Sequence, residues 1–402
     1  MEIRAITYFC ALNTPETTLP RVGAFLAESD RAFQAAGVRV QSRRVAGAAL
    51  STLDVAPSDL PLFAARLRQN CAAVGIRYAA LGVLSADADP AYLSALADVF
   101  SGYPSQGIFA SAEIASHTHG INLAWLREVA AAKARFSRLM PDGEANLYFC
   151  GSANVPSGTP FFPSAYHDGG AERFALAIQA ADLAYMAFNG AATPDQARQN
   201  LRELVERAAA QLVPIAEQLA AAHGVTFGGL DFSFAPYPGE QSSLAAALEQ
   251  LGIQVGAAGA LAAAALVMNA VEAAAFPRCG FSGLMLPVLE DTRLGARAAE
   301  GTLSVNDLLL YSAVCGTGLD CIPLAGDVPT ETLAAILLDV ASLALRLDKP
   351  LTARLMPLPN KHVGDPTDFT FEYFVPSRVM AVQGSLASGA LSSNSVFNVQ
   401  PR

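Results

Sequence analysis

Short apolar runs alternate with longer helical stretches along almost the whole chain, and this alternation most constrains the fold. A chain in which strands alternate with helices builds a parallel sheet. Several of the runs are apolar throughout, as expected of strands that are covered on both faces. The predicted strands lie at residues 3–10, 38–45, 78–83, 107–111, 145–150, 183–188, 229–234, 280–286, 319–323 and 352–356. About ten strands are many for an open sheet, so we predict an α/β fold closed into a ten-stranded barrel.

Helices are predicted between these strands, and local signals mark the ends of some of them. Thr193 precedes Pro194 at the start of one long helix, and Gly224 follows its last residue, His223. A hydroxyl side chain before the first turn and a glycine after the last turn are typical helix boundaries. The predicted helices lie at residues 19–36, 60–74, 122–138, 194–223, 243–251, 261–275, 305–314 and 330–347.

The composition favours one large domain with an extensive buried core. Hydrophobic residues make up 52% of the 402 residues, charged residues make up 15%, and the net charge is −10. Nucleic-acid binding requires a basic surface, which a chain of this charge lacks. We predict a single domain over residues 1–402, with a long loop or lid at residues 151–170 and an irregular tail at residues 383–402.

The sequence predicts a soluble, cytoplasmic protein without a membrane span. Its first residues form an alternating run and do not resemble a signal peptide. The six cysteines are widely scattered, as expected of reduced thiols. Residues 253–271 are uncharged and long enough to span a bilayer, but they are mostly Ala and Gly, which favour a buried helix over insertion.

Ligands of α/β proteins bind beyond the carboxyl ends of strands, so candidate residues are sought there. Cys10 and Asn13 follow the first strand, and Asn154 follows the fifth. These three are predicted to bind substrate, although a packed thiol and ordinary turn residues would give the same pattern. His167 lies in the loop at residues 151–170 and is the best candidate for a general acid or base, because imidazole titrates near neutral pH. A local packing role for His167 is the alternative.

Further along the chain, polar residues interrupt apolar strands. Asp231 and Ser233 alternate onto one face of a predicted strand. If that face points inward, Asp231 is a second catalytic candidate and Ser233 contacts the substrate. An outward Asp231 would be an ordinary solvated residue. Ser282 lies in the next strand and is also predicted to bind substrate.

The acidic pair Glu290 and Asp291 ends the eighth predicted strand, and Asp327 follows the ninth. Carboxylates at strand ends can hold a divalent metal, or they can cap a helix. We therefore predict Glu290, Asp291 and Asp327 as metal ligands and a divalent metal as the cofactor. His117 and His119 are a weaker metal signal, because no further ligand is fixed by their spacing.

Several blocks together resemble one family. They are residues 3–9, residues 230–236, residues 280–283 with the acidic pair behind them, and residues 318–320 with Gly326 and Asp327. In this order they look like the family called domain of unknown function 711, also uncharacterised protein family 0210. The resemblance implies a fold related to the ten-stranded barrels of pyruvate formate-lyase. It also implies a partner, because members occur beside a small ACT-domain protein.

Glycyl radical enzymes of that barrel type use a cysteine on an interior loop and a glycine in a C-terminal Arg-Val-x-Gly-Tyr motif. Cys315 is the cysteine that could correspond, and it is the third catalytic candidate. Residues 382–402 lack the glycine motif, which argues against radical chemistry. Two functions stay open: an enzyme acting by acid/base chemistry on a small polar metabolite, and a non-catalytic sensor or scaffold for a small ligand. A homo-oligomer is compatible with either.

Overall fold

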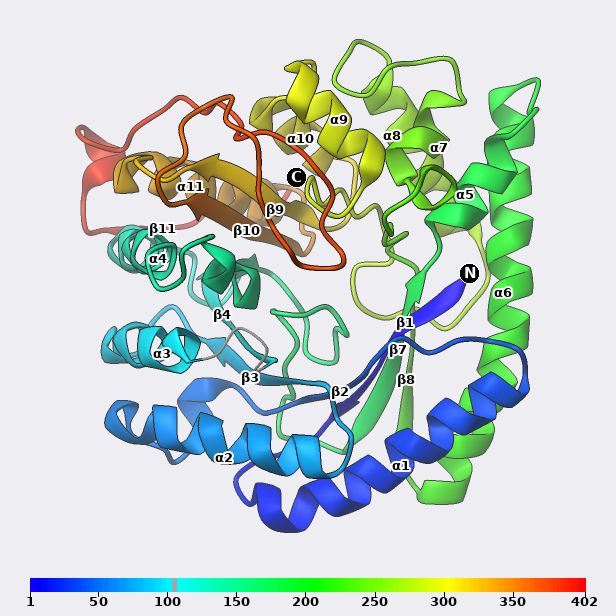
Figure 1. The fold of residues 1–402 in the computed structure, drawn as a ribbon, viewed down its shortest axis with the longest axis horizontal. Helices are drawn as coiled ribbons and strands as arrows, with labels where there is room; N and C mark the ends of the chain where they lie inside the picture. Colours follow the sequence, from blue (N-terminus) through cyan, green and yellow to red (C-terminus); the bar gives the residue numbers. More distant parts are fainter. Residues whose placement is uncertain (103–106) are drawn as a thin grey trace.

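The computed structural model describes residues 1–102 and 107–402 as one mixed α/β fold, drawn in Figure 1. Its strands are β1 (Glu2–Phe9), β2 (Arg43–Ala46), β3 (Tyr78–Leu84), β4 (Ile108–Ala115), β5 (Ile121–Asn122), β6 (Phe149–Ala153), β7 (Arg173–Gln179), β8 (Thr226–Asp231), β9 (Gly318–Ala325), β10 (Leu351–Leu358) and β11 (Val396–Phe397). Its helices are α1 (Pro15–Ala35), α2 (Leu60–Ala73), α3 (Ala91–Ser101), α4 (Leu123–Phe136), α5 (Ala181–Phe188), α6 (Pro194–His223), α7 (Leu244–Glu249), α8 (Ala260–Ala273), α9 (Thr292–Glu300), α10 (Val305–Ser312) and α11 (Thr330–Arg346).

Within the described residues, nine strands form one sheet in the order β8-β7-β1-β2-β3-β4-β6-β10-β9. Strands β1, β2, β3, β4 and β6 run parallel to one another, and so do β7 with β8 and β10 with β9. The pairs β1–β7 and β6–β10 are antiparallel. The sheet therefore consists of a first parallel half that is flanked by strands of a second half running the opposite way.

The prediction of a closed ten-stranded barrel is wrong, because β8 and β9 are free edges of the ladder. The segment predicted as a strand at residues 280–286 joins neither ladder. Single bridges lie just before and just after it, Leu230 with Arg278 and Pro287 with Asp320. Positive φ angles at Gly280 (60°) and Ser282 (41°) break its extended course. Pro287 also lacks the N–H that a ladder requires.

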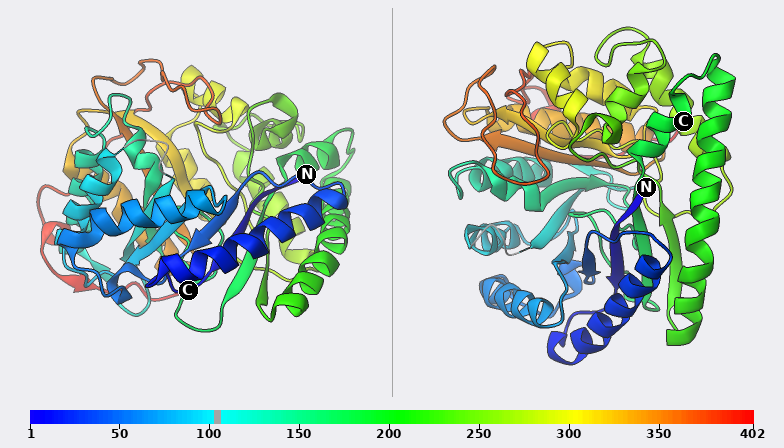
Figure 2. Two further views of the ribbon diagram at one scale, coloured as in Figure 1. Left: turned by 60° about the horizontal axis from the view of Figure 1, so that its bottom comes forward. Right: turned by 45° about the vertical axis from the view of Figure 1, so that its right-hand side comes forward.

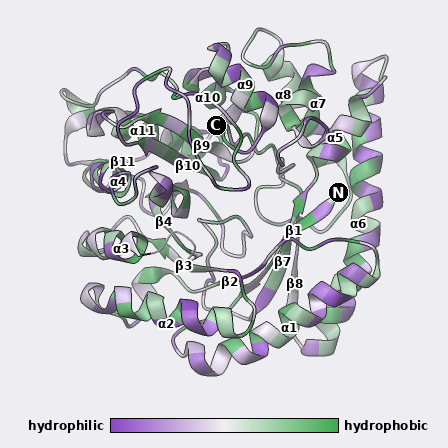
Figure 3. Cartoon of the chain, in the orientation of Figure 1, coloured by the Kyte–Doolittle hydropathy of each residue, from purple (hydrophilic) through white to green (hydrophobic). Residues whose placement is uncertain are grey.

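Helices cover the outer side of the curved sheet. Helices α1, α2, α3, α4 and α11 pack side by side in that order, as Figures 1 and 2 show, and α6 packs beside α1 and α5. Figure 3 shows that the strands are mostly hydrophobic, while the helices are hydrophobic on some faces and hydrophilic on others. This pattern is expected when helices bury one face against a sheet.

Most predicted elements are present, and the largest error concerns residues 183–188. This run was predicted as a strand but belongs to α5, and the strand of that region is β7, which was not predicted. A short apolar run fits both the period of a helix and that of a strand, so the hydrophobic pattern alone does not distinguish a helix from a strand. The cap predictions for α6 are confirmed: Thr193 accepts a hydrogen bond from the Gln196 N–H, and Gly224 adopts φ 63°.

The segment at residues 253–271 contributes most of α8, whose Val267, Ala270 and Val271 are buried. No helix in the described part of the chain is long and apolar enough to cross a membrane. The loop at residues 151–170 is buried over most of residues 158–167 and lies between the two halves of the sheet. The tail at residues 383–402 is mostly exposed and contains only the short strand β11, which pairs with β5.

Candidate functional site

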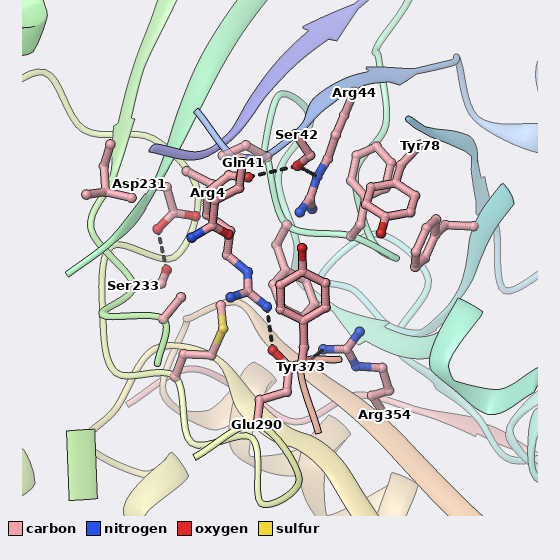
Figure 4. Close-up of a pocket in the computed structure, with 18 of the residues that line it drawn as sticks. Arg4, Gln41, Ser42, Arg44, Tyr78, Asp231, Ser233, Glu290, Arg354 and Tyr373 are labelled. Carbon is pink, nitrogen blue, oxygen red and sulfur yellow. Dashed lines mark hydrogen bonds and ion pairs between the residues drawn. The ribbon is translucent and has the colours of Figure 1, made fainter. Parts of the chain in front are cut away.

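A cavity lies on the inner side of the curved sheet, and Figure 4 shows the side chains that line it. The space that water-sized centres can occupy is about 80 Å³, several times what one water needs. The first half of the sheet contributes residues near the amino ends of its strands. The second half contributes residues near the carboxyl ends of β7 and β8, and Arg354 from the middle of β10. The polar lining residues are Arg4, Gln41, Ser42, Arg44, Tyr78, Asp231, Ser233, Glu290, Arg354 and Tyr373, and the aromatic ones include Phe109, Phe161, Phe162 and Phe371.

Two of the three arginines in the cavity are paired with carboxylates. Arg354 of β10 donates from Nε to Asp320 Oδ1 at 2.5 Å and from Nη2 to Glu290 Oε1 at 3.4 Å. Arg4 of β1 donates to the other oxygen of Glu290. Burial by itself would raise the pKa of Glu290, but Arg4 and Arg354 outweigh it and hold that pKa below its ordinary value. This network is a fixed, largely neutralised wall of the cavity.

Arg44 of β2 differs, because no carboxylate of the described residues lies within ion-pairing distance of it. Its Nε donates to Ser42 Oγ at 2.9 Å. Its guanidinium carbon lies 5.3 Å from the centre of the Tyr78 ring and 5.2 Å from that of Phe162. Burial and the nearby charge of Arg4 lower the pKa of Arg44 to about 10, so it is still a cation at neutral pH. Its two Nη groups donate no hydrogen bond to the described residues, and Figure 4 shows them inside the cavity.

Asp231 ends β8 and lies on the opposite side of the cavity from Arg44 (Figure 4). Its carboxylate accepts hydrogen bonds from Ser233 Oγ, from the Ser282 N–H at 2.9 Å and from the Phe281 N–H at 3.2 Å. Burial raises its pKa to about 6 despite these donors. A carboxyl group with this pKa exchanges protons readily near neutral pH, as a general acid or base must.

The close approach of residue 280 to Asp231 requires a glycine. A Cβ at Gly280 would overlap the Asp231 carboxylate, and Gly280 adopts φ +60°, which other residues rarely do. The backbone can therefore turn tightly here and direct the N–H groups of Phe281 and Ser282 at the acid.

Comparison with known proteins places the chain in a family. A sequence model described as "Uncharacterised ACR (DUF711)" matches residues 1–377. The chain belongs to this family. The resemblance drawn from the sequence blocks is thereby confirmed, whereas the relation to pyruvate formate-lyase-like barrels is not shown.

Three curated relatives of this chain are named only as UPF0210 proteins. That of Pyrobaculum arsenaticum is 37% identical over 260 residues, which are 62% of this chain and 57% of the relative. That of Syntrophobacter fumaroxidans is 30% identical over 355 residues, 83% of this chain and 77% of the relative. That of Lactobacillus delbrueckii subsp. bulgaricus is 27% identical over 350 residues, with the same coverage. The chain spans 57–63% of the length of four curated relatives, from three Pyrobaculum species and from Methanopyrus kandleri.

The DUF711 protein brings three of the predicted site residues into one cavity: Asp231, Ser233 and Glu290. The inward orientation expected of Asp231 is observed, and the residue is 2% exposed. Ser282 lies next to them, but its hydroxyl donates to the carbonyls of Leu230 and Cys279, so only its N–H serves Asp231.

Asp291 lies beside Glu290 in sequence and performs a separate, structural task. It is fully buried, and its carboxylate accepts five hydrogen bonds. The donors are Ser243 Oγ and the N–H groups of Leu244, Ala245, Arg293 and Leu294. Asp291 thus caps α9 and also holds the first turn of α7, which is the helix-cap alternative of the sequence prediction. Its lone pairs are engaged, so it does not share a metal with Glu290.

Asp327 and Asn13 lie away from the cavity. Asp327 is on the surface, where its Oδ2 is 3.4 Å from His362 Nδ1. Asn13 is exposed in the turn after β1. The convergence that was expected of all the strand-end residues therefore does not extend to these two.

His167 and the two candidate cysteines are buried outside the cavity. His167 Nδ1 accepts from the Gly169 N–H at 3.2 Å, and its Nε2 is 3.3 Å from the carbonyl of Ala171. Both ring nitrogens are thus used within the loop, as in the packing alternative. Burial raises the pKa of the Cys10 thiol to about 12, mainly by desolvation. Cys315 is also buried, and its carbonyl accepts from the Lys349 ammonium.

The residues that could hold a metal in the structure differ from the predicted metal ligands. Among the described residues, Glu290, Asp320 and Cys321 offer ligand atoms within 4.8 Å of one another. Both carboxylates already bind guanidinium groups, and burial raises the pKa of the Cys321 thiol well above its ordinary value. The set therefore fits the arginines better than it fits a divalent ion.

Sequence reasoning missed the three arginines, because none of them lies at the carboxyl end of a strand, where ligands of α/β proteins are expected. Arg354 stands in an otherwise apolar strand, β10, whose residues are all buried. A charge in such a run must face a partner or a cavity, because an unpaired buried charge is costly. This signal was available at Arg4 and Arg354. It was weaker at Arg44, which stands next to Arg43 and looks like part of a surface pair.

Proposed function

We propose that the cavity is the active site for a small metabolite that carries a carboxylate, held by Arg44 and acted on by Asp231. The observation that carries the proposal is the guanidinium of Arg44, which lies in the cavity without a carboxylate partner among the described residues. A buried charge without a counter-ion is unfavourable, and a bound anion would supply one. A planar guanidinium suits a carboxylate, which it can bind through two parallel hydrogen bonds.

The other lining residues support a ligand with a small apolar body. Tyr78 and Phe162 stand against the guanidinium of Arg44, and Phe161 and Met285 contribute further apolar surface. Apolar walls with a few polar groups at defined positions are typical of metabolite sites. The cavity volume accommodates a compound of few carbon atoms.

Asp231 is the group that would move a proton. With its pKa raised to about 6, it is mostly ionised at pH 7 and can accept a proton from a substrate O–H or C–H at a carboxylate oxygen. Ser233 and the N–H groups of residues 281 and 282 hold that carboxylate in place. Such positioning, combined with a pKa near the working pH, is what general base catalysis requires.

Carboxylate binding by Arg44 is tested by thermal shift with a panel of small monocarboxylates and dicarboxylates. The proteins compared are the wild type, Arg44→Met and the control Arg39→Met. Arg39 is an exposed arginine of the same region, with a side chain that is 69% exposed. We expect at least one carboxylate to stabilise the wild type and the Arg39 variant but not the Arg44 variant. Equal stabilisation of all three proteins would refute the role of Arg44.

A test of proton transfer by Asp231 distinguishes an enzyme from a sensor of the same metabolite. The sensor is the alternative that would involve an ACT-domain partner. Asp231→Asn keeps the shape of the side chain but cannot accept a proton. For an enzyme, this variant should bind the carboxylate identified above and lose turnover, because proton transfer contributes about 10²–10⁴-fold to rate. Binding without turnover in the wild type as well would favour the sensor.

Two finer predictions also remain proposals. The relation to pyruvate formate-lyase-like folds is supported by two parallel half-sheets of opposite direction, joined at the β1–β7 and β6–β10 pairs. An experimental structure compared with such barrels would test it. The divalent metal has weak support, from Glu290, Asp320 and Cys321. Elemental analysis of the purified protein that finds no metal would remove it.

A further inference from the structure

Because the two halves of the sheet run in opposite directions, the carboxyl ends of the first half lie at the other end of the concave face. Phe109 of β4 lines the cavity, and Glu113 lies four residues further along the same face of that strand. At about 3.3 Å per residue the two positions are roughly 13 Å apart. Around Glu113 a second pocket opens at the ends of β3, β4 and β6. Its lining includes Glu113, Ser116, His119 and Ser152.

This second pocket contains a hydrogen-bonded carboxylate–imidazole pair. His119 Nδ1 is 2.6 Å from Glu113 Oε1, and Ser116 Oγ donates to the same oxygen at 2.8 Å. The backbone N–H of His119 donates to Ser116 Oγ at 3.0 Å, which closes a small ring of contacts. In the tautomer that donates from Nδ1 to Glu113, Nε2 is an acceptor.

Two acceptors of the pair stay unused. Neither Glu113 Oε2 nor His119 Nε2 has a hydrogen-bond partner among residues 1–102 and 107–402. Ser152 Oγ donates to the Ala112 carbonyl at 3.3 Å, so its own lone pairs are a third acceptor on the wall. The pocket therefore presents acceptors where the arginine-lined cavity presents donors.

The electrostatic surroundings of this pocket are acidic. Asp348 lies at 2.7 Å from the neighbouring His117, outside the pocket lining. No ion-pair partner for Glu113 other than His119 occurs in the described part of the chain. A ligand here gains from positive charge and from N–H donors.

We propose that this second pocket binds a small primary ammonium ion, with Glu113 Oε2, His119 Nε2 and Ser152 Oγ as acceptors for its three N–H groups. An ammonium group offers three donors and no acceptor, which matches the free groups of the wall. A metal centre fits less well, because the one three-ligand cluster found among the described residues lies elsewhere. The proposal does not depend on the function proposed for the arginine-lined cavity.

The experiment is a titration of methylammonium chloride into protein with ¹⁵N-labelled histidine, followed by NMR, with sodium chloride at equal ionic strength as the reference. We expect saturable shifts of the His119 ring nitrogens and not of the His167 ring, which is hydrogen-bonded within its own loop. No shift of His119 up to high millimolar methylammonium, or equal shifts with sodium chloride, would overturn the proposal.

Two variants and one control test the acceptors. Glu113→Gln removes the charge, and we expect it to weaken methylammonium binding about tenfold or more, since a hydrogen bond to a charged group is lost. His117→Ala is the control, because His117 is exposed and does not line the pocket, and its affinity should equal that of the wild type. If Glu113→Gln does not fold, His119→Gln takes its place. Binding to that variant is measured by the line broadening of the methyl protons of methylammonium. Unchanged affinity in the folded variant would refute the assignment.

Discussion

Replacement of Asp291 by alanine offers the sharpest test of how this structure is held together. The Asp291 carboxylate serves two helices at once. Oδ1 accepts from Ser243 Oγ at 2.5 Å and from two N–H groups at the start of α9, and Oδ2 accepts from the N–H groups of Leu244 and Ala245 in α7. Asp291→Ala leaves all five donors without this acceptor in a place that water does not reach.

The magnitude follows from these contacts. Loss of a helix N-cap costs about 0.5–2 kcal/mol, and each buried donor left unpaired costs about 1–3 kcal/mol. Part of this is offset, because burial raises the pKa of Asp291 and so disfavours its charge. We expect the free energy of unfolding to fall by about 3–5 kcal/mol, within the range of large single-residue effects. Asp291→Asn should recover only part of the loss, because its amide N–H₂ would face donors at one of the two helices.

The measurement is urea unfolding followed by circular dichroism, with Asp327→Ala as the matched control. Asp327 is an exposed acid that was predicted for the same metal-binding role, and its removal should change stability by about 0.5 kcal/mol or less. A loss below about 1 kcal/mol for Asp291→Ala would refute the double-cap reasoning. Loss of a bound divalent ion at unchanged stability would restore the metal interpretation.

Three further predictions concern the cavity. Gly280→Ala should destabilise the protein by about 1–2 kcal/mol, because alanine disfavours the positive φ and its Cβ would displace Asp231. It should also abolish proton transfer. A variant with wild-type unfolding and turnover would contradict this prediction. Because the pKa of Asp231 is raised to about 6, the folded state binds more protons than the unfolded state between about pH 4 and pH 6. Stability should therefore fall by about 3 kcal/mol over that window as pH rises, and Asp231→Asn should remove this slope in pH-dependent urea unfolding. Arg354→Met leaves Asp320 and part of Glu290 unpaired and should cost about 3–5 kcal/mol, which thermal unfolding would show; an unchanged midpoint would mean that the pair is not buried in solution.

The sequence predicted the α/β class, because long periodic segments such as α6 and apolar strands such as β10 give strong local patterns. It wrongly predicted that the sheet closes into a barrel, whereas β8 and β9 are edges of an open sheet. The segment at residues 280–286 is apolar enough to be a strand, but its positive φ angles are dictated by the contact of Gly280 with Asp231. A contact between residues so distant in sequence leaves no periodic signal.

The candidate site was predicted in part. Asp231, Ser233 and Glu290 were found because strand ends were searched and because a buried acid stands out among apolar neighbours. Arg44 was missed because its surroundings, Tyr78 and Phe162, come from other elements. His167 was selected for its chemistry, yet the loop around it determines that both its nitrogens are occupied.

The opposed halves of the sheet also determine the order in which the chain can assemble. Pairings within β1, β2, β3 and β4 join neighbouring segments and can form early. In contrast, β6 must wait for β10, about two hundred residues later, as in the pairing of Ala153 with Leu351. Such distant pairings slow folding, since a long loop must close before the contact stabilises it. On the ribosome, β6 remains an uncovered edge until almost the whole chain has been synthesised, and this interval is when association with other chains competes with folding.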